Sequence, residues 1–440
     1  MNFVIIGGGI SGLNSAYKLA KQFPHIKIQI LEKSDRLGGR IKSEIVNDDL
    51  TIELGAGGFM SSHKRVIELV KELKLDDQVV PSLNDQIKPR SNGRALAITS
   101  DIDTNIGIIP KIYHIDKFES IFDTDFYSII DNLTLRMENP VFRKMAMSYT
   151  LFDLVEKFFG WSTANSMVYQ FGYRGDFWYQ NSVQAVKMFT FDFNPTSAFY
   201  QFKKGMIQII QQLALKVKEY HIEISLNTEC VDIEKNESKY QIKLSNGQTI
   251  NSDQIILAIP LNSLIKIPFL SKIHNKLNMI RPKALCRIYA TFPLVDGKVW
   301  FDFLPSTITT KSTLCQVVPY DKSQGVMMIY SDDIYADFWG KCWVDGTLER
   351  ELMFHLIKLF SDKEVPSPIN IVVAYWNAAT HLWRPSLDPV VKHHEMIQPI
   401  ESENIYIVGE AYSLNQQWSE GALQSVESLM ELIVDKFKDK

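Results

Sequence analysis

The feature that most restricts the fold of this chain is a glycine pattern close to its start. Gly7, Gly9 and Gly12 form a G-x-G-x-x-G motif that follows the apolar run 3–6 and opens a helix-like stripe from residue 10. In a strand–turn–helix unit, Gly7 permits the tight turn, Gly9 lets the backbone approach a pyrophosphate, and Gly12 lets the helix pack on the strand. The motif therefore predicts a dinucleotide-binding unit.

An acidic residue at the expected distance supports this prediction. Glu32 lies 20 residues after Gly12 and ends the next strand-like run, 26–31. An acid in this place accepts hydrogen bonds from the adenosine ribose, while the N–H groups of Ser11 and Gly12 at the helix start favour phosphate. A glycine-rich turn with an unrelated surface Glu is the alternative. The motif alone does not distinguish NAD from FAD.

Two later blocks return to the same strand and helix patterns. One runs from a helical face that begins at Met206, through a hairpin at Asn246-Gly247, to the apolar strand 255–259. The other has a strand at 405–408 and a helix from Gly421. We expect an α/β fold in which a discontinuous nucleotide-binding domain contains an inserted α+β domain. The nucleotide-binding domain is expected to comprise residues 1–80, 200–262 and 396–440. The inserted domain, expected to bind the substrate, comprises residues 81–199 and 263–395.

Composition excludes several classes of function. The formal net charge of -4 argues against a nucleic-acid partner held by phosphate contacts, because such a partner normally requires a basic stripe. The four cysteines are far apart and the histidines lack metal-ligand spacing, so we expect thiols that are mostly buried and no metal. The first residues do not resemble a secretory signal and the last are too polar to span a bilayer, which predicts a cytoplasmic protein.

Two further segments carry a family resemblance. Residues 36–40 read R-L-G-G-R, and residues 53–58 read E-L-G-A-G-G. Both resemble signatures of the flavin-containing amine oxidase superfamily, which includes monoamine, polyamine and L-amino-acid oxidases. The resemblance implies a Rossmann-like FAD-binding domain of the two-dinucleotide-binding type. It also implies that Arg40 neutralises the pyrophosphate with its planar donors. The small residues Ala56, Gly57 and Gly58 would pass close to a flat ring system.

The resemblance continues to the end of the chain. Residues 204–206 are similar to the family's G-G-M helix start, and Val231 lies in the segment whose backbone meets the adenine. In the C-terminal motif, the resemblance implies that Glu410 contacts the ribityl hydroxyls. Gly421 and Ala422 would then begin a helix whose dipole stabilises the reduced flavin. Since residues 374–404 contain no Cys, we expect a non-covalent cofactor.

The substrate residues match the family less well. Trp418 stands where the family has an aromatic wall that steers an amine, although a packed core Trp is the alternative. The opposite wall falls near Ala379, a small residue. Arg287 replaces a Lys that the family links to oxygen reactivity, and the two are not equivalent. Three hypotheses follow for Arg287: slow reaction with O₂, a grip on a substrate carboxylate, or a structural ion pair.

The leading functional prediction is oxidation of a small amine or amino-acid-like substrate, with hydride transfer to flavin N5 and O₂ or another acceptor reoxidising the flavin. A desaturase or protoporphyrinogen-oxidase-like activity on an apolar substrate is the second. A flavin-binding scaffold with weak catalysis is the third. Fold alone does not decide among them.

Overall fold

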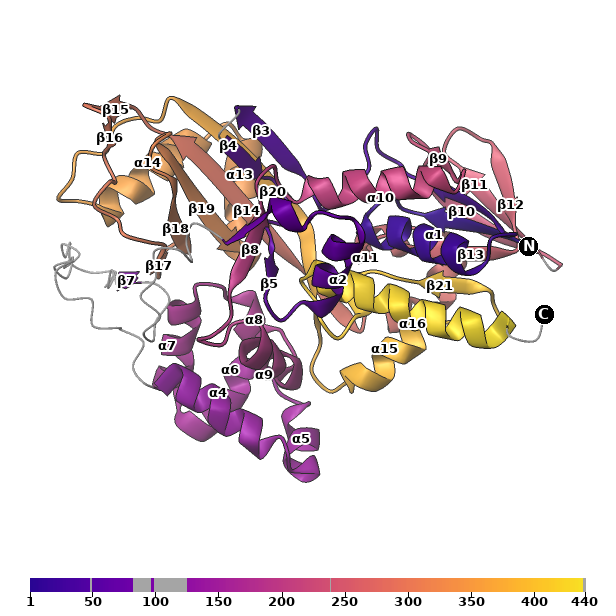
Figure 1. The fold of residues 1–440 in the computed structure, drawn as a ribbon. Helices are drawn as coiled ribbons and strands as arrows, with labels where there is room; N and C mark the ends of the chain where they lie inside the picture. Colours follow the sequence, from indigo (N-terminus) through magenta and orange to yellow (C-terminus); the bar gives the residue numbers. More distant parts are fainter. Residues whose placement is uncertain (48–49, 82–95, 99–124, 238, 438–440) are drawn as a thin grey trace. The chain divides into compact units, whose positions relative to one another are not determined.

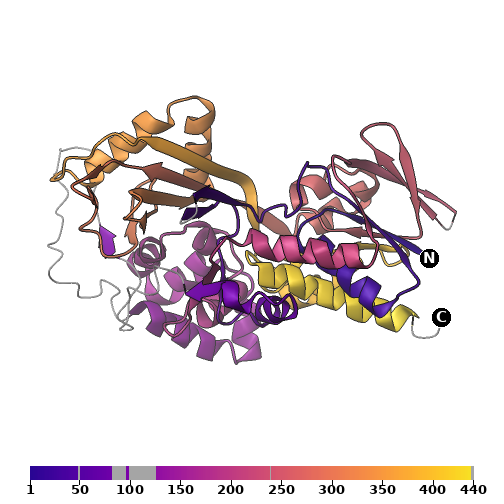
Figure 2. The same ribbon diagram turned by 45° about the horizontal axis from the view of Figure 1, so that its top comes forward.

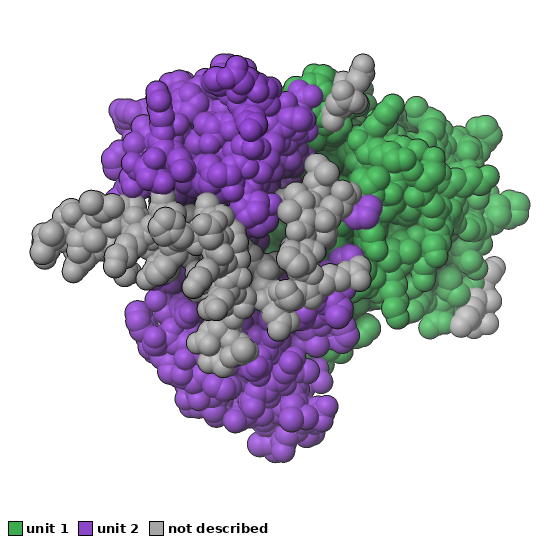
Figure 3. Space-filling model, turned by 60° about the vertical axis from the view of Figure 1, so that its left-hand side comes forward, with its two compact units in different colours: residues 1–80, 199–282, 380–440 green, residues 81–198, 283–379 purple. Residues whose placement is uncertain are grey.

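The computed structural model describes residues 1–47, 50–81, 96–98, 125–237 and 239–437 (Figure 1). The chain divides into two compact units, coloured separately in Figure 3. Unit 1 comprises residues 1–80, 199–282 and 380–440, and unit 2 comprises residues 81–198 and 283–379. The later segments thus change unit at 282 and 380, whereas we expected 262 and 396. The assignment of cofactor binding to one unit and substrate binding to the other stays a prediction.

Unit 1 is built on a five-stranded parallel sheet in the order β21-β13-β1-β2-β9. Its strands come from all three segments of the unit, and this arrangement confirms the α/β prediction. The strands are β1 (Asn2–Ile6), β2 (Lys27–Leu31), β9 (Glu223–Ser225), β13 (Gln254–Leu257) and β21 (Ile405–Ile407).

Both faces of this sheet are buried, as the continuous apolar strands indicate. Phe3 and Ile5 point into one core, and Val4 and Ile6 point into another. Helix α1 contacts α10 and α16 over the first face (Figures 1 and 2). The second face packs on an antiparallel sheet and short helices. The helices of the first face are α1 (Ile10–Gln22), α2 (Lys64–Glu72), α10 (Ile207–Glu219) and α16 (Ser419–Phe437).

The antiparallel sheet of unit 1 contains the predicted hairpin. Strands β11 (Lys239–Leu244) and β12 (Thr249–Ser252) pair across Asn246-Gly247, and β10 (Cys230–Asn236) lies beside β11. Gly247 has φ +83°, which a residue with a side chain rarely adopts. The other elements of unit 1 are β3 (Ser43–Asn47), β4 (Leu50–Glu53), β5 (Phe59–Met60), β8 (Phe199–Phe202), α11 (Leu261–Leu264), η2 (Pro268–Ile273), α12 (His274–Leu277), α15 (Pro389–Ile397) and η3 (Glu410–Tyr412).

The start of α2 differs from expectation. Ser61 and Ser62 just before it are of a residue type that can cap a helix, but its N-cap is His63, whose side chain makes no capping bond. The buried carboxylate of Glu420 accepts instead from the backbone N–H groups of Arg65 at 3.2 Å and Val66 at 3.0 Å. A side chain distant in sequence therefore satisfies the donors that a local Ser would otherwise bind.

Unit 2 combines a sheet with a helical layer, which confirms the inserted α+β prediction. Its sheet has the order β20-β14-β19-β18-β17-β7, and α13 and α14 contribute to the core on one face. The strands are β7 (Leu96–Ile98), β14 (Ile280–Thr291), β17 (Ile308–Thr310), β18 (Gln316–Asp321), β19 (Val326–Asp332) and β20 (Asn370–Trp383). The two helices are α13 (Asp333–Val344) and α14 (Leu348–Leu359).

Residues 125–191 of unit 2 contain many Phe, Tyr and Trp side chains and are largely helical. Buried Phe, Leu, Val and Met side chains of six helices form one core, so much of this aromatic content fills a core. The helices are α4 (Asp125–Arg136), α5 (Pro140–Ala146), α6 (Leu151–Phe159), α7 (Trp161–Phe171), α8 (Gly175–Trp178) and α9 (Ser182–Phe191).

A buried polar cluster connects this helical layer to the sheet of unit 2. Lys283 on β14 forms an ion pair of 2.9 Å with Asp176 on α8, and both side chains are buried. Asp332 at the end of β19 accepts from the N–H groups of Arg174 and Gly175 at 3.0 and 2.8 Å. The pKa of Asp332 is raised to about 6, mainly because its carboxyl is buried. The charge of Lys283 opposes this rise, and the charge of Asp176 adds to it.

All four cysteines are free thiols and three of them are buried, as expected. Among the described residues, no helix is long and apolar enough to cross a membrane.

Candidate cofactor-binding site

The predicted cofactor residues of unit 1 gather at one edge of its parallel sheet. Gly7 follows β1, Glu32 follows β2 and Glu410 follows β21. In parallel α/β sheets, ligands bind outside the carboxyl ends of the strands. Residues from the first and last segments of the chain therefore meet at the edge where a nucleotide would bind.

The glycines of the first loop serve different steric purposes. A Cβ on Gly12 would lie 1.9 Å from the Gly7 carbonyl oxygen, and one on Gly7 would lie 2.4 Å from that of Ala258. A Cβ on Gly9 would meet only the Gly38 oxygen, at 3.9 Å. Packing thus requires Gly7 and Gly12, whereas Gly9 borders open space that an approaching phosphate can use.

The start of α1 suits an anion. None of the described side chains caps this helix, and its first turn contains no acidic residue. Its first N–H groups, including those of Ser11 and Gly12, lie where the positive end of the helix dipole favours a phosphate.

Glu32 is held rigidly beside this loop. Its Oε2 accepts from the Gly8 N–H at 2.7 Å, and its Oε1 accepts from the N–H and hydroxyl of Ser34 at 2.9 and 2.7 Å. The carboxylate is buried. These bonds fix its orientation, and a carboxylate with three donors keeps capacity for a ribose hydroxyl.

The second glycine pair lies against the first loop. The Gly38 N–H donates to the Gly8 oxygen at 2.9 Å, and a Cβ on Gly39 would meet only the Gly9 Cα, at 3.8 Å. Arg36 donates to the Gly39 oxygen at 2.7 Å, so the first arginine of R-L-G-G-R shapes the loop. The sequence analysis assigned no role to Arg36.

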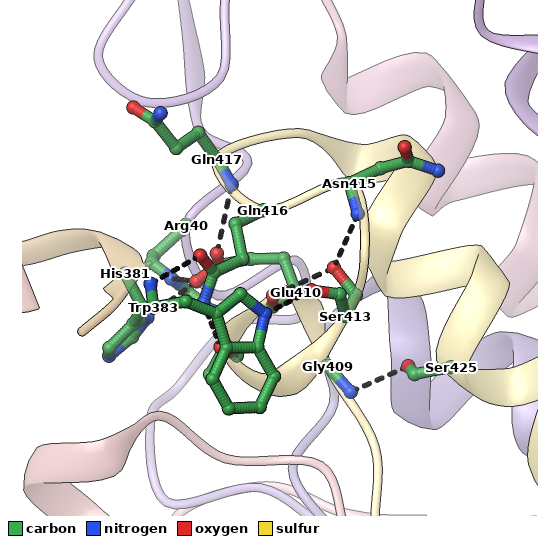
Figure 4. Close-up of polar contacts among 11 residues, drawn as sticks. Arg40, His381, Trp383, Gly409, Glu410, Ser413, Asn415, Gln416, Gln417 and Ser425 are labelled. Carbon is green, nitrogen blue, oxygen red and sulfur yellow. Dashed lines mark hydrogen bonds and ion pairs between the residues drawn. The ribbon is translucent and has the colours of Figure 1, made fainter. Parts of the chain in front are cut away.

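Arg40 joins the buried residues Glu410 and His381 in one polar network (Figure 4). Oε1 of Glu410 accepts from Arg40 Nη1 at 2.5 Å and lies 2.6 Å from His381 Nδ1, while Oε2 accepts from the Gln417 N–H at 3.0 Å. Burial alone would raise the pKa of the Glu410 carboxyl, but His381 and Arg40 beside it lower that pKa to about 2. Glu410 is therefore ionised.

His381 was not among the predicted site residues. It lies 29 positions from Glu410 on a strand that carries none of the recognised motifs. No signal in the chain distinguishes this histidine from the other eight, so only the fold identifies it.

Other predicted residues also have contacts within unit 1. A Cβ on Gly58 would lie 2.2 Å from the Tyr200 oxygen. The Ala56 N–H donates to the Arg40 oxygen at 3.0 Å, and the Gly57 oxygen accepts from Gln201 at 3.2 Å. Packing already explains the small residue at 58, so the role of residues 56–58 beside a flavin stays a prediction.

Val231 lies at an irregularity of the β10–β11 ladder. The register passes from Cys230 to Asp232 without a partner for Val231, which is 40% exposed. An irregular ladder leaves a strand's backbone oriented differently from that of its neighbours. Its contact with adenine stays a prediction.

The loop before α16 orients Trp418. Its indole ring lies edge-on to His63 with the ring centroids 4.8 Å apart, and Phe199 lies at 6.5 Å. The preceding Gln417 has φ +75°, and its N–H binds Glu410. Such a backbone persists only where surrounding contacts hold it, so the position of the indole is tied to the Glu410 network.

Gly421 and Ala422 are engaged by the same loop. Their N–H groups donate to the Trp418 oxygen at 3.1 and 3.4 Å. A Cβ on Gly421 would lie 2.1 Å from the Asn415 oxygen. The loop thus explains Gly421 sterically, and contact of either residue with the flavin stays a prediction.

Arg287 belongs to unit 2, on β14. It is paired in register with Tyr330 of β19, and its guanidinium lies 4.4 Å from the centroid of that ring. The ring of Tyr173 contacts Tyr330 at 5.2 Å. Burial opposes the charge, but Tyr330 and Tyr289 raise the pKa of Arg287 above its ordinary value, so the side chain is a permanent cation.

The residues of unit 1 fit FAD. Gly9 and Gly39 border space that side chains would fill, α1 begins without a cap, and Glu32 is oriented beside the loop. This combination defines a dinucleotide-binding protein of the α/β class.

Comparison with known proteins identifies the family. Residues 10–426 match the model of flavin containing amine oxidoreductases, and the chain belongs to this family. It is therefore an FAD-dependent oxidoreductase. A solved structure of putrescine oxidase bound to putrescine has a TM-score of 0.73 at 16% identity, covering 99% of both chains, which supports the fold.

Three relatives show the breadth of the family. Uncharacterized protein R188 of Acanthamoeba polyphaga mimivirus is 24% identical, over 98% of this chain and 93% of that protein. Coproporphyrinogen III oxidase of Staphylococcus aureus is 25% identical, over 58% of this chain and 60% of the relative. Probable flavin-containing monoamine oxidase A of Dictyostelium discoideum is 28% identical, over 58% of this chain and 57% of the relative. These relatives leave the substrate open.

Proposed function

We propose that this protein oxidises a small amine or amino-acid-like substrate, with FAD bound non-covalently. Bound FAD supplies the acceptor for a hydride equivalent, and the protein supplies binding, orientation and exclusion of water. Gly7, Gly9 and Gly12 would form the phosphate loop, and Glu32 and Arg40 would bind the ribose and pyrophosphate. The remaining proposed cofactor residues are Ser11, Ala56, Gly57, Gly58, Val231, Glu410, Gly421 and Ala422.

The observation that carries the proposal is the setting of Trp418. This residue is half-buried. The rings of His63 and Phe199 lie beside its indole, and the preceding residue, Gln417, has a strained backbone. A core Trp needs no such fixed loop. An indole face attracts a substrate cation and the positive charge that develops on an amine as it is oxidised. Trp418 would therefore be the aromatic wall that orients the substrate.

Arg287 bears on the choice between amines and amino acids. Its guanidinium lies 4.4 Å from the centroid of the Tyr330 ring and keeps its charge. A planar fork of donors suits a carboxylate, which favours an amino-acid-like ligand. The other two hypotheses predict different behaviour of Arg287→Lys. If Arg287 controls reoxidation, the variant changes the rate at which reduced flavin reacts with O₂. If Arg287 only forms a structural contact, the variant changes neither this rate nor the affinity for substrate.

The test is reduction of the bound flavin by candidate substrates without oxygen. The purified holoenzyme is mixed anaerobically with monoamines, polyamines and amino acids, and the visible flavin absorption is followed. We expect one of these classes to bleach the flavin within a catalytic turnover. If none of them does, the proposal is wrong.

A second candidate is oxidation of a porphyrinogen, and the similarity to coproporphyrinogen III oxidase favours it. The same assay decides, because coproporphyrinogen or protoporphyrinogen would then bleach the flavin while amines and amino acids would not. Absence of bleaching by every compound would support the scaffold hypothesis.

A further inference from the structure

An unsatisfied polar atom lies inside the Glu410 network. His381, near the end of β20, is fully buried, with an exposed fraction of 0%. Its Nδ1 lies 2.6 Å from Glu410, but its Nε2 has no hydrogen-bond partner among the described residues. Native proteins rarely leave such an atom unpaired, because its desolvation is not compensated.

The protonation of the network follows from Glu410. An ionised carboxylate only accepts hydrogen bonds, so Nδ1 of His381 carries a proton and donates it to Oε1. The carboxylate thus fixes both the tautomer and the orientation of the imidazole ring. The other ring nitrogen, Nε2, then lies on the side away from Glu410 (Figure 4) and can accept a hydrogen bond when it carries no proton.

Glu410, like Glu32, keeps about one acceptor position. Arg40 and His381 bind its Oε1, and the Gln417 N–H binds its Oε2. A carboxylate offers about four acceptor positions, and three of them are occupied here. Nε2 of His381 differs from the Glu410 carboxylate in having no hydrogen-bond partner at all among the described residues. It lies close to the sheet edge at which Gly9 and Glu32 also lie.

We propose that His381 is a cofactor-binding residue whose Nε2 accepts a hydrogen bond from a hydroxyl group of bound FAD. Glu410 acts as a positioning residue that holds the imidazole for this contact. The donor we assign is a hydroxyl of the ribityl chain, the flexible sugar-alcohol part of the cofactor. This proposal depends on FAD binding, which the family establishes, and not on the identity of the substrate.

The test compares FAD release from three holoenzymes. In His381→Asn, the shorter amide keeps a donor near the Nδ1 position and has nothing at the Nε2 position. In His381→Gln, the longer amide reaches the Nε2 position. The control is His393→Asn, because His393 is equally buried but both of its ring nitrogens have protein partners, the Tyr412 oxygen at 2.8 Å and the Ser428 hydroxyl at 3.0 Å.

Release is followed after dilution by the recovery of flavin fluorescence. We expect His381→Asn to release FAD about tenfold faster than the wild type, the effect of losing one buried hydrogen bond. We expect His381→Gln and His393→Asn to stay within about threefold of the wild type. The gain in Tm on adding excess FAD should shrink in His381→Asn and persist in His393→Asn.

Two results would overturn the proposal. One is an unchanged release rate in His381→Asn, which would mean that water or nothing occupies the Nε2 site. The other is release from His381→Gln that is tenfold faster or more, and this measurement decides the question if His381→Asn does not fold. Either result leaves the proposed oxidation of amines untouched, since anaerobic bleaching tests that separately.

Discussion

At the scale of single residues, the loop after β1 separates two uses of glycine. Gly12 has no side chain because the Gly7 carbonyl occupies the place of its Cβ, at 1.9 Å. Gly9 has no such neighbour, since the nearest oxygen would be 3.9 Å away. One glycine therefore serves the folded chain, and the other leaves room for a ligand.

These two residues give a matched pair of substitutions. Gly12→Ala should lower the free energy of unfolding by about 3 kcal/mol, because a methyl group must displace backbone. Gly9→Ala should change that energy by less than about 1 kcal/mol and weaken FAD binding by about tenfold or more. Urea unfolding without added FAD and titration with FAD measure the two effects. Equal losses of stability in both variants would contradict the assignment.

A residue-level requirement can be found in the sequence where that requirement is local. The spacing from Gly7 to Gly12 and on to Glu32 is set by one strand, one turn and one helix, so the sequence contains it. His381 was missed because its partner Glu410 belongs to another element. Gly421 was interpreted through the cofactor, yet the Asn415 oxygen already excludes a side chain there.

At the scale of elements, α2 shows how one helix end can depend on another. Glu420 in the first turn of α16 accepts two N–H groups at the start of α2. Its carboxylate also lies at the positive end of the α2 dipole and binds the Arg65 guanidinium at 3.1 Å. The two helices are thus joined through one buried side chain, 4% exposed.

Glu420→Ala should lower the free energy of unfolding by about 2 kcal/mol, because buried donors lose their acceptor. Glu427→Ala is the control. Glu427 also binds Arg65, at 2.6 Å, but its side chain is 45% exposed, so its loss should cost less than about 1 kcal/mol. Chemical denaturation of both variants at neutral pH is the measurement, and a larger effect at Glu427 would refute this account of the cap.

Element existence was predicted better than element ends. The strand-like runs 3–6, 26–31 and 255–259 predicted the parallel strands, because a strand buried on both faces consists mostly of apolar residues. From the sequence alone, Ser61 or Ser62 would be chosen as the cap of α2, because capping residues are sought within a few residues of the helix start. Nothing local indicates that an acid more than 350 positions away takes that place.

At the scale of the whole molecule, buried carboxyl groups give stability a dependence on pH. Asp332 has a pKa raised to about 6 from 3.8. A carboxyl whose folded-state pKa is raised contributes stability that is complete below its unfolded pKa and is lost as the pH rises through the folded value. Glu410 has a lowered pKa, so its effect on stability depends on pH in the opposite direction. Its contribution to stability is present above pH 4.5 and is lost as the pH falls towards 2.

The difference in free energy of unfolding between the wild type and Asp332→Asn should therefore change with pH. We expect it to fall by about 3 kcal/mol from pH 4 to pH 7, because each unit of pKa shift corresponds to about 1.4 kcal/mol. Denaturant midpoints of both proteins across this interval provide the measurement. The exposed Asp345→Asn serves as the control. A difference that is constant with pH would show that Asp332 ionises as in the unfolded chain.

The three-part origin of unit 1 has a consequence for biosynthesis. Strand β1 and helix α1 are synthesised well before β21, which pairs with β13, and well before α16, which packs on α1. A nascent chain on the ribosome consequently carries a half-built sheet with an unprotected edge. If Glu410 and His381 hold FAD as proposed, a complete FAD site forms only after β20 and β21 have been synthesised. Until then the incomplete sheet exposes surface that is prone to aggregate.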